Sequence, residues 1–419
     1  MTIAELKHRA ETAFAAALAA ASPARAIATA IRDLESAPTF VLGIGKAAVA
    51  MAEACRNQGI NAPGMLVTNR ENARQVTGFE LYRGGHPVPD QGSLDAAAAI
   101  SARLSGLGED DHLLVLLSGG GSALMALPMP GLTLDHKIRL NQALLGSGLD
   151  IHAMNAVRRL FSRVKGGRLA ALAAPARITQ WALSDVPGDA LISIASGPFA
   201  AETTPFDVTL GYLEASGLLN ESWVGEALAR LRAGDAEMPL MQGDKRLDKI
   251  ETSILASNSI CVEAALASLG PAAVTLPPLE GEASAMGRQL AELIREATQP
   301  LAGVAGGETV VRLPARHGLG GRSQELALAF LAAMAEANSG GEWVLLAAGT
   351  DGRDGPTDAA GGCVTSEMLG HADAARAALE AHDSHPCLEA MGGLVRCPPT
   401  GTNLADLVVV LASPCGGPV

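Results

Sequence analysis

The chain has 419 residues, of which 48% are hydrophobic and only 3% aromatic, so two or three domains with cores of Ala, Leu and Val are expected. The formal net charge is −13 and the sequence contains no basic run, which excludes a nucleic-acid partner because an acidic surface repels phosphate backbones. The six cysteines form no CxxC pair, so a zinc site has little support and a reducing cytosol is indicated.

The N-terminal segment lacks the basic and apolar regions of a signal peptide. The chain also contains no uncharged apolar run of the ~18 residues that a membrane span needs. We therefore expect a cytoplasmic protein without a membrane partner. The apolar run Leu326–Ala335 is interpreted as a buried helix.

Strands and helices alternate through the first half of the chain, after an Ala-rich helical segment at residues 3–35. The hydrophobic pattern predicts strands at 39–44, 65–68, 80–82, 112–117 and 177–183, and helices at 46–56, 93–104, 133–145 and 152–163. Strands that alternate with helices and end in Gly or Asp loops predict an α/β fold with a mostly parallel sheet.

The stretch Arg232–Lys249 is polar and weakly periodic, and we interpret it as a linker. A second α/β series follows, with strands predicted at 253–257, 309–313, 343–348 and 405–411, and helices at 261–269, 282–297 and 323–335. These patterns predict an N-terminal domain of residues 1–235 and a C-terminal domain of residues 250–419. The first helices are counted with the N-terminal domain, and packing on the C-terminal domain is the alternative.

Two glycine-rich loops follow predicted strands. Gly43-Ile44-Gly45-Lys46-Ala47-Ala48 allows the backbone to approach an anion closely, and Lys46 adds a positive charge. The loop fits the dinucleotide pattern G-x-G-x-x-A but not a Walker A loop, and a plain turn with a solvated lysine is the alternative. In Ser118-Gly119-Gly120-Gly121-Ser122, three glycines after a core strand favour a nest of backbone N–H groups for phosphate over a flexible connector.

Carboxylates and one arginine complete the set of candidate residues. Asp185 and Asp189 follow a strand and can hold Mg²⁺ or accept a hydroxyl proton, unless they only cap a turn. The loop at 349–358 carries Asp351 and Asp358 but lacks the final Glu of a calcium loop, so a metal site and a solvated loop are equal alternatives. Arg322 opens a helix after a glycine-rich run, which suits bidentate capture of a carboxylate or phosphate, although a surface arginine is the alternative.

In combination, these motifs resemble the glycerate 2-kinase family whose C-terminal part is the multi-organism fragment with rich leucine. The matching segments span nearly the whole chain in the expected order, and the match is looser only at Thr203–Asp207. They are Gly43–Ala47, Gly85–Asp90, Leu117–Ala123, Leu183–Asp189 with Ser196-Gly197-Pro198, Gly318–Glu325, Gly349–Gly362 and Thr400–Asp406.

The resemblance implies transfer of a phosphoryl group from ATP to the 2-hydroxyl of glycerate, with a divalent cation such as Mg²⁺ and 2-phosphoglycerate as the product. It also implies a Rossmann-like, three-layer N-terminal domain and a smaller mixed α/β C-terminal domain, with the active site in the cleft between them. Lys46 and Arg322 map onto the family's proposed catalytic residues.

We assign the remaining candidates by residue type and position. Asp185 is the third catalytic candidate, although which carboxylate is the base stays open, and Asp189, Asp351 and Asp358 are candidate metal ligands. The nucleotide is assigned to Gly43, Gly45, Ser118, Gly119, Gly120, Gly121, Ser122, Glu308 and Asn403.

Two other classes of function are considered. An NAD(P)H-dependent hydroxypyruvate reductase, a label that some family members carry, is supported by the G-x-G-x-x-A pattern. It also needs a ribose-binding acid after the next strand, where Thr68-Asn69-Arg70 stands with Glu71 just beyond. A non-enzymatic small-anion sensor would leave the several loops rich in ionisable groups unexplained. The oligomeric state is open, with a homodimer as one option.

Overall fold

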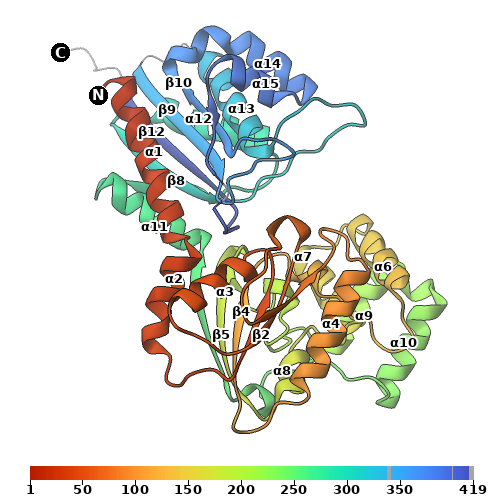
Figure 1. Ribbon diagram of the computed structural model, residues 1–419. Helices are drawn as coiled ribbons and strands as arrows, with labels where there is room; N and C mark the ends of the chain where they lie inside the picture. The colour runs from red at the N-terminus through yellow and green to blue at the C-terminus, as the bar shows by residue number, and fades with distance from the viewer. Residues whose placement is uncertain (337–340, 399, 415–419) are drawn as a thin grey trace. The chain divides into compact units, whose positions relative to one another are not determined.

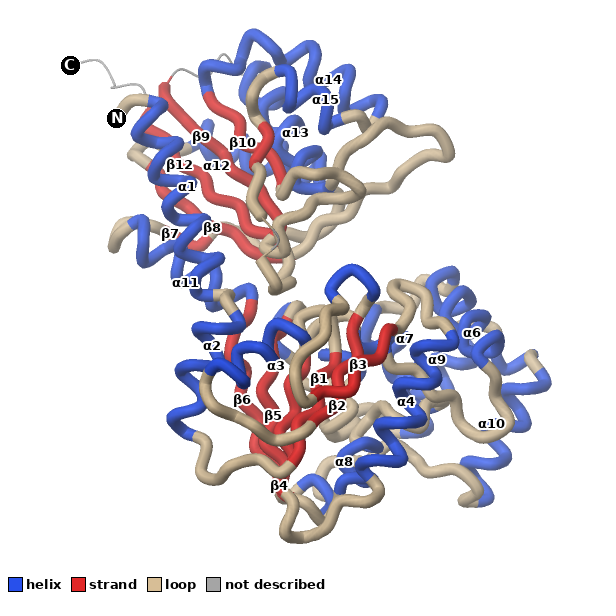
Figure 2. The backbone as a smooth tube through the Cα atoms, viewed as in Figure 1, coloured by secondary structure: helices blue, strands red, loops and turns tan. Residues whose placement is uncertain are grey.

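The computed structural model describes residues 1–336, 341–398 and 400–414. The chain divides into two compact units, one of residues 26–255 and one that combines residues 1–25 with residues 256–419. Each unit is built on its own six-stranded sheet with helices packed against it (Figures 1 and 2). The predicted α/β fold class is confirmed. The first helix belongs to the same unit as residues 256–419.

The sheet of unit 26–255 has the strand order β3-β2-β1-β4-β5-β6. The pairs β1–β2, β1–β4, β2–β3 and β4–β5 are parallel. This is the order of a dinucleotide-binding fold, in which ligands bind outside the carboxyl ends of the strands where the strand order reverses, here between β1 and β4. The strands are β1 Phe40–Ile44, β2 Gly64–Thr68, β3 Phe79–Arg83, β4 His112–Leu117, β5 Arg177–Ser184 and β6 Ile250–Ser257.

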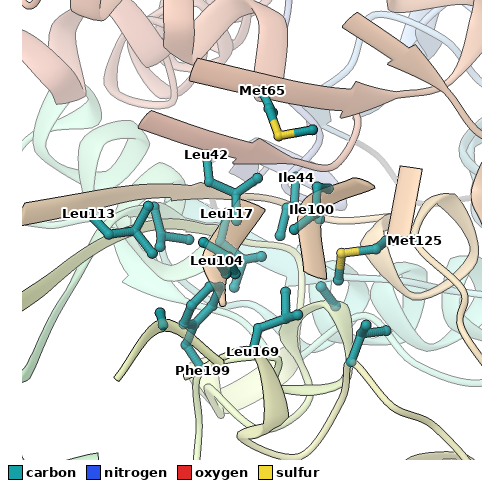
Figure 3. Close-up of a cluster of buried hydrophobic side chains, with 14 of the residues drawn as sticks. Leu42, Ile44, Met65, Ile100, Leu104, Leu113, Leu117, Met125, Leu169 and Phe199 are labelled. Atoms are coloured by element: carbon teal, nitrogen blue, oxygen red, sulfur yellow. The ribbon is translucent and has the colours of Figure 1, made fainter. Parts of the chain in front are cut away.

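Both faces of the central strands are buried, which explains the continuous apolar sequence of β4. Alternate side chains such as Leu42, Leu113 and Leu117 meet Ile100 of α4 and Leu169 of α8 in one core (Figure 3). Helix α3 contacts β1, β2 and β4. The helices are α2 Pro23–Ala30, α3 Ala48–Asn57, α4 Gln91–Leu104, α5 Gly121–Leu124 and α8 Arg168–Ala173.

Four further helices of this unit form a second apolar cluster beside the sheet. Leu140, Val157, Leu213 and Trp223 are among its buried side chains. Helix α7 contacts both α6 and α9, and Figure 1 shows α6, α9 and α10 grouped at one side of the unit. The helices are α6 Leu134–Gly146, α7 Ile151–Leu160, α9 Phe206–Ala215 and α10 Ser222–Ala233.

A buried ion pair links α7 to the segment that precedes α9. Arg159 donates from Nε and Nη2 to the Glu202 carboxylate at 2.5 and 2.8 Å, and both side chains are 3% exposed. The backbone N–H groups of Thr203 and Thr204 donate to the same carboxylate at 2.9 and 3.0 Å. Burial raises the pKa of Glu202, but the Arg159 guanidinium and the two N–H groups outweigh it and hold the pKa below its usual value.

Replacing Glu202 by glutamine should destabilise unit 26–255 by about 3 to 5 kcal/mol, because the Arg159 charge would remain buried without its partner. Since the pKa of Glu202 is lowered by folding, its contribution is complete above the pKa of the unfolded chain and is lost as the pH falls through the folded pKa. Thermal unfolding between pH 3 and pH 7 should therefore show a smaller loss of stability on acidification in E202Q than in the wild type. Equal acid slopes would contradict this assignment.

The other sheet has the order β11-β10-β9-β12-β8-β7. Its pairs are antiparallel except for β7–β8, which is parallel, so the sheet is mixed. Helices α1 and α11 contact each other on this sheet, and α12 packs on α13, which contacts β9 and β10 (Figure 1). The elements are α1 Ile3–Ala20, α11 Asn258–Leu269, β7 Val274–Thr275, α12 Ala283–Glu296, β8 Leu301–Gly307, α13 Arg322–Glu336, β9 Gly341–Gly349, β10 Gly361–Thr365, α14 Ala372–Ala381, α15 Ser384–Ala390, β11 Leu394–Val395 and β12 Asp406–Pro414.

Two predicted strands differ from the structure. The strand predicted at 309–313 is wrong, because Val310 and Leu313 are exposed. The strand of this region is β8, which lies earlier in the chain and whose small residues fit between β12 and β7. The strand predicted at 253–257 exists as β6, but it extends the first sheet and does not begin the second. Its alternating half-exposed pattern fits an edge strand. The buried helix at 326–335 is confirmed as part of α13.

Within the described residues, no single helix is both long and apolar enough to cross a membrane. The helical segments Ile3–Ala20 and Pro23–Asp33 have that length and apolar composition only when taken together, and the chain bends by 48° between them. The five described cysteines are free, and Cys415 lies outside the described residues.

Candidate active site

Three loops of unit 26–255 meet at the point where the strand order reverses. Backbone hydrogen bonds join the loop after β1 to the loop after β4: Lys46 N donates to Gly119 O at 2.9 Å, and Ser118 N donates to Ile44 O at 2.9 Å. The Ser118 hydroxyl accepts from Ala47 N at 3.0 Å. The two glycine-rich loops therefore form one continuous surface at the carboxyl edge of the sheet.

The glycines of these loops allow contacts that a side chain would block. A Cβ on Gly45, whose φ is +121°, would lie 2.3 Å from Ser118 Oγ. A Cβ on Gly119 would lie 1.9 Å from Asp185 Oδ2, so the Asp185 carboxylate rests against the loop backbone. The loop after β5 thus brings a carboxylate to the same place as the two glycine-rich loops.

Lys46 and His86 flank Gly120. A Cβ on Gly120 would lie 3.1 Å from Lys46 Cγ and 3.3 Å from His86 Cδ2. Burial and the Lys46 charge lower the pKa of His86, with Glu71 opposing them. These effects favour the neutral imidazole, which can donate or accept a hydrogen bond beside the lysine.

Arg322 forms the centre of the candidate site in the other unit. As the first residue of α13, it donates from Nε and Nη2 to Asp406, at 2.5 Å to Oδ2 and 3.1 Å to Oδ1. Its Nη1 donates to Glu308. Asp354 caps the same helix by accepting from Ser323 N at 3.2 Å and Gln324 N at 2.8 Å. A carboxylate clamp and a helix cap therefore fix the position of the guanidinium.

Asp406 is the acid of this cluster whose pKa is shifted furthest. It is 4% exposed, and burial raises its pKa to about 7 even though Arg322 opposes the shift. Asp354 and Glu308 raise the pKa further through their charges. The pKa of the Asp406 carboxyl therefore lies near neutral pH, whereas its charged neighbours raise the pKa of Arg322, which stays protonated.

Replacing Asp406 by asparagine should remove a pH-dependent step in stability. Because the folded pKa of Asp406 lies above that of the unfolded chain, the folded protein binds the extra proton between about pH 4 and pH 7. Stability contributed by this group should therefore fall as the pH rises through that window, by up to about 1.4 kcal/mol per pH unit. Melting temperatures of the wild type and D406N at pH 5, 6, 7 and 8 test this, and parallel curves would contradict it.

The predicted metal ligands of this unit do not lie together. A Cβ on Gly349 would lie 3.2 Å from Asp351 Oδ1 and 3.4 Å from Asp406 Oδ1, so Asp351 is beside the Arg322 clamp. Asp358 is instead exposed, and its two oxygens bond His385 Nε2 at 2.7 Å and Arg396 Nε at 3.2 Å. Among the described residues, no group of three His, Cys, Asp or Glu side chains could hold a metal.

Family models match residues 9–229 to a domain of unknown function, DUF4147, and residues 301–406 to the MOFRL family. A D-glycerate 2-kinase of Thermotoga maritima is 35% identical over 93% of this chain and 94% of its own length. A protein of Agrobacterium vitis, provisionally named as a hydroxypyruvate reductase, is 37% identical over 95% of this chain and 92% of its own. The crystal structure of the glycerate kinase of Thermotoga maritima has a TM-score of 0.85 at 33% identity and covers 98% of this chain and 100% of that chain.

The chain belongs to the glycerate 2-kinase family. The resemblance drawn from the motifs is therefore confirmed, and so is the Rossmann-like fold. A further glycerate 2-kinase, from Pyrococcus horikoshii, is 33% identical over 95% of both chains.

In this member of the glycerate 2-kinase family, the structure divides the predicted site residues between its two units. Unit 26–255 brings together Lys46, Gly45, Ser118, Gly119, Gly120 and Asp185. The other unit brings together Arg322, Glu308 and Asp351. Asn403 lies half-buried in the loop that precedes β12, where Leu404 N donates to Thr350 Oγ1 at 2.8 Å.

Other predicted residues have a local role that the structure makes plain. A Cβ on Gly43 would lie 2.5 Å from Leu66 Cδ2, and a Cβ on Gly121 would lie 2.6 Å from Ala195 Cβ, so both glycines permit close packing. Ser122 shares a hydrogen bond with Ser196 at 2.6 Å. Asp189 ends the 3-10 turn Pro187–Asp189 with a φ of 54°, which Asp tolerates better than most residues.

The sequence reasoning missed Asp406, Asp354 and the position of His86. All three lie in segments whose motifs match the glycerate 2-kinase family, at Thr400–Asp406, Gly349–Gly362 and Gly85–Asp90. An acid at the start of the apolar strand β12 was the available signal for Asp406, because a buried carboxylate needs a cationic partner.

Proposed function

We propose that the protein transfers the γ-phosphoryl group of ATP to the 2-hydroxyl of glycerate and releases 2-phosphoglycerate. Membership of a kinase family implies a nucleotide substrate. The observation that carries the proposal further is the meeting of Lys46 and two glycine-rich loops at the switch point of a dinucleotide-type sheet. Phosphoryl transfer depends on positioning and charge neutralisation, which backbone N–H groups and a lysine can supply.

Lys46 is assigned to the transferring phosphoryl group, and Arg322 is assigned to the glycerate carboxylate. Arg322 has five N–H donors, of which three bond Asp406 and Glu308. The two that remain, one on each terminal nitrogen, suffice for a substrate carboxylate. Asp185, resting against Gly119, is the candidate to accept the hydroxyl proton.

A divalent cation such as Mg²⁺ fits this site only as a partner of the nucleotide. Mg²⁺ usually takes one or two carboxylates together with phosphate oxygens and water, which agrees with the absence of a three-ligand cluster among the described residues. Asp189 in unit 26–255 and, separately, Asp351 in the other unit are the carboxylates proposed as candidate ligands. Asp358 fits less well because both of its oxygens already bond His385 and Arg396. The cation would supply charge neutralisation on the phosphates.

One coupled assay tests the proposal and its alternative. In buffer with Mg²⁺, purified protein should convert ATP and D- or L-glycerate to ADP and a phosphoglycerate, and NMR should place the phosphate on the 2-hydroxyl. In a parallel sample, hydroxypyruvate with NADH or NADPH should show no steady oxidation of the nucleotide. Oxidation without kinase activity would replace the proposal with the reductase.

A further inference from the structure

Lys165 is a buried lysine that the proposed mechanism does not use. It is 1% exposed and lies close behind the second glycine-rich loop, where its Nζ donates to the carbonyl of Ser122 at 2.8 Å. Within the described residues, no carboxylate forms an ion pair with it. A buried lysine bonded only to a neutral carbonyl has no negative charge to stabilise its ammonium form.

Other cations surround Lys165. Burial lowers its pKa well below the usual value, and the charges of Lys137, Arg158 and Arg159 lower it further. Arg159 has its own carboxylate partner in Glu202. The remaining two do not pair with an acid among the residues that the structure describes. Three basic side chains therefore share one region without a counter-charge, and an anion bound there would favour the charged forms of the two lysines.

Helices α6 and α7 fix the positions of Lys137 and Arg158. Lys137 and Asn141 are four residues apart and lie on the same side of α6. Arg158 of α7 donates from Nε to Asn141 Oδ1 at 3.1 Å and from Nη1 to Asn155 Oδ1 at 3.1 Å. Two neutral amides therefore hold the guanidinium next to Lys137 without neutralising it. Lys137 and Arg158 are half-buried, so a ligand from solvent can reach them.

We propose that Lys137, Arg158 and Lys165 form an anion subsite that binds phosphoryl oxygens beside the loop Ser118–Ser122. The inference rests on the proposed function and extends it to residues outside the recognised motifs. In a chain with a net charge of −13, three basic side chains without an acidic partner are a local departure from the overall charge that favours a multiply charged anion.

A phosphoryl group matches this subsite better than a carboxylate does. A phosphate monoester or polyphosphate carries about two or more negative charges near pH 7 and three or more acceptor oxygens, whereas the glycerate carboxylate carries one charge. Two sources can supply the group: the polyphosphate chain of the nucleotide and the new phosphate of 2-phosphoglycerate. Binding experiments with each ligand can distinguish them.

The test uses the full chain with K137Q and R158Q, which remove one charge each from half-buried positions. K165M is added where its thermal unfolding shows a folded protein. The matched control is R139Q, because Arg139 lies on the same helix as Lys137 but is exposed and pairs with Asp135 at 2.8 Å. Titration calorimetry in Mg²⁺ buffer measures the binding of inorganic tripolyphosphate, a non-hydrolysable ATP analogue, 2-phosphoglycerate and glycerate.

K137Q and R158Q should each weaken the binding of at least one phosphorylated ligand by about tenfold to a hundredfold, the effect of losing one charge-assisted hydrogen bond. A loss for the ATP analogue alone assigns the subsite to the nucleotide, and a loss for 2-phosphoglycerate alone assigns it to the product. R139Q should bind every ligand like the wild type. Unchanged affinities in folded K137Q and R158Q, or a loss confined to glycerate, would overturn the proposal. The wild-type protein could also bind tripolyphosphate through these residues and yet show no turnover of ATP with glycerate. That result would refute the kinase proposal but would support the subsite.

Discussion

Replacing Lys46 by methionine should lower kcat/KM for glycerate phosphorylation by about a hundredfold to a thousandfold, the usual effect of removing one group that stabilises charge in the transition state. Methionine keeps the apolar stem that lies against Gly120, with the Gly120 Cβ position 3.1 Å from Lys46 Cγ, and removes only the ammonium group. The coupled assay for ADP, run alongside circular dichroism and thermal unfolding, measures the loss in a folded protein.

The control for this substitution is K249M. Lys249 is exposed and pairs with Glu109 at 3.3 Å, so its loss should change neither kcat nor KM. A K46M enzyme within threefold of the wild type would remove Lys46 from the chemistry and leave the glycine-rich loops without their cation.

Replacing Gly45 by alanine should destabilise unit 26–255 by about 3 kcal/mol or more. The added Cβ would lie 2.3 Å from Ser118 Oγ and 2.4 Å from Ser118 O, in a backbone conformation with a φ of +121° that L residues rarely adopt. Both loops at the strand switch point would have to move. We expect the melting temperature of this unit to fall by about 6 to 12 °C.

The G59A variant separates backbone strain from steric overlap. Gly59 also has a positive φ, of +87°, but no atom lies within 4 Å of its Cβ position. Its substitution should cost only about 1 to 2 kcal/mol. If G45A and G59A lowered stability equally, the close contact between the two loops would not be the reason for glycine at position 45.

The sequence predicted the elements whose local signals and tertiary environment agree. The strand 112–117 was predicted with the bounds that β4 has, because a continuous apolar run between polar ends suits a strand buried on both faces. The loops that follow β1, β4 and β5 were found for the same reason: their glycines and acids interrupt the apolar pattern at the strand ends.

The errors arose where tertiary pairing overrides local preference. The segment Thr309–Leu313 has the composition of a strand but is largely exposed, whereas β8 is built from Ala and Gly residues that only its neighbours stabilise. The strand β6 was found, but the sheet it joins could not be deduced because strand order is a long-range property.

The candidate site was predictable only in part for a similar reason. Lys46 and Arg322 lie next to glycines, which marks them in the sequence. Lys165 and Asp406 become noticeable only through burial and through their partners, Ser122 for the lysine and Arg322 for the acid. Their partners are 43 and 84 residues away in the chain, a separation that no local pattern encodes.

The position of α1 has a consequence for folding of the chain during its synthesis on the ribosome. Leu6, Ala10 and Ala13 are buried against elements that are translated last, since α1 contacts α11, β9 and β12. At about 5 to 20 residues per second, the helix must wait on the order of tens of seconds for β12 to emerge. Unit 26–255 can fold in that interval as an inserted domain, while the apolar side of α1 stays uncovered. The buried face of α1 therefore gains its packing partners only after β12 has been synthesised.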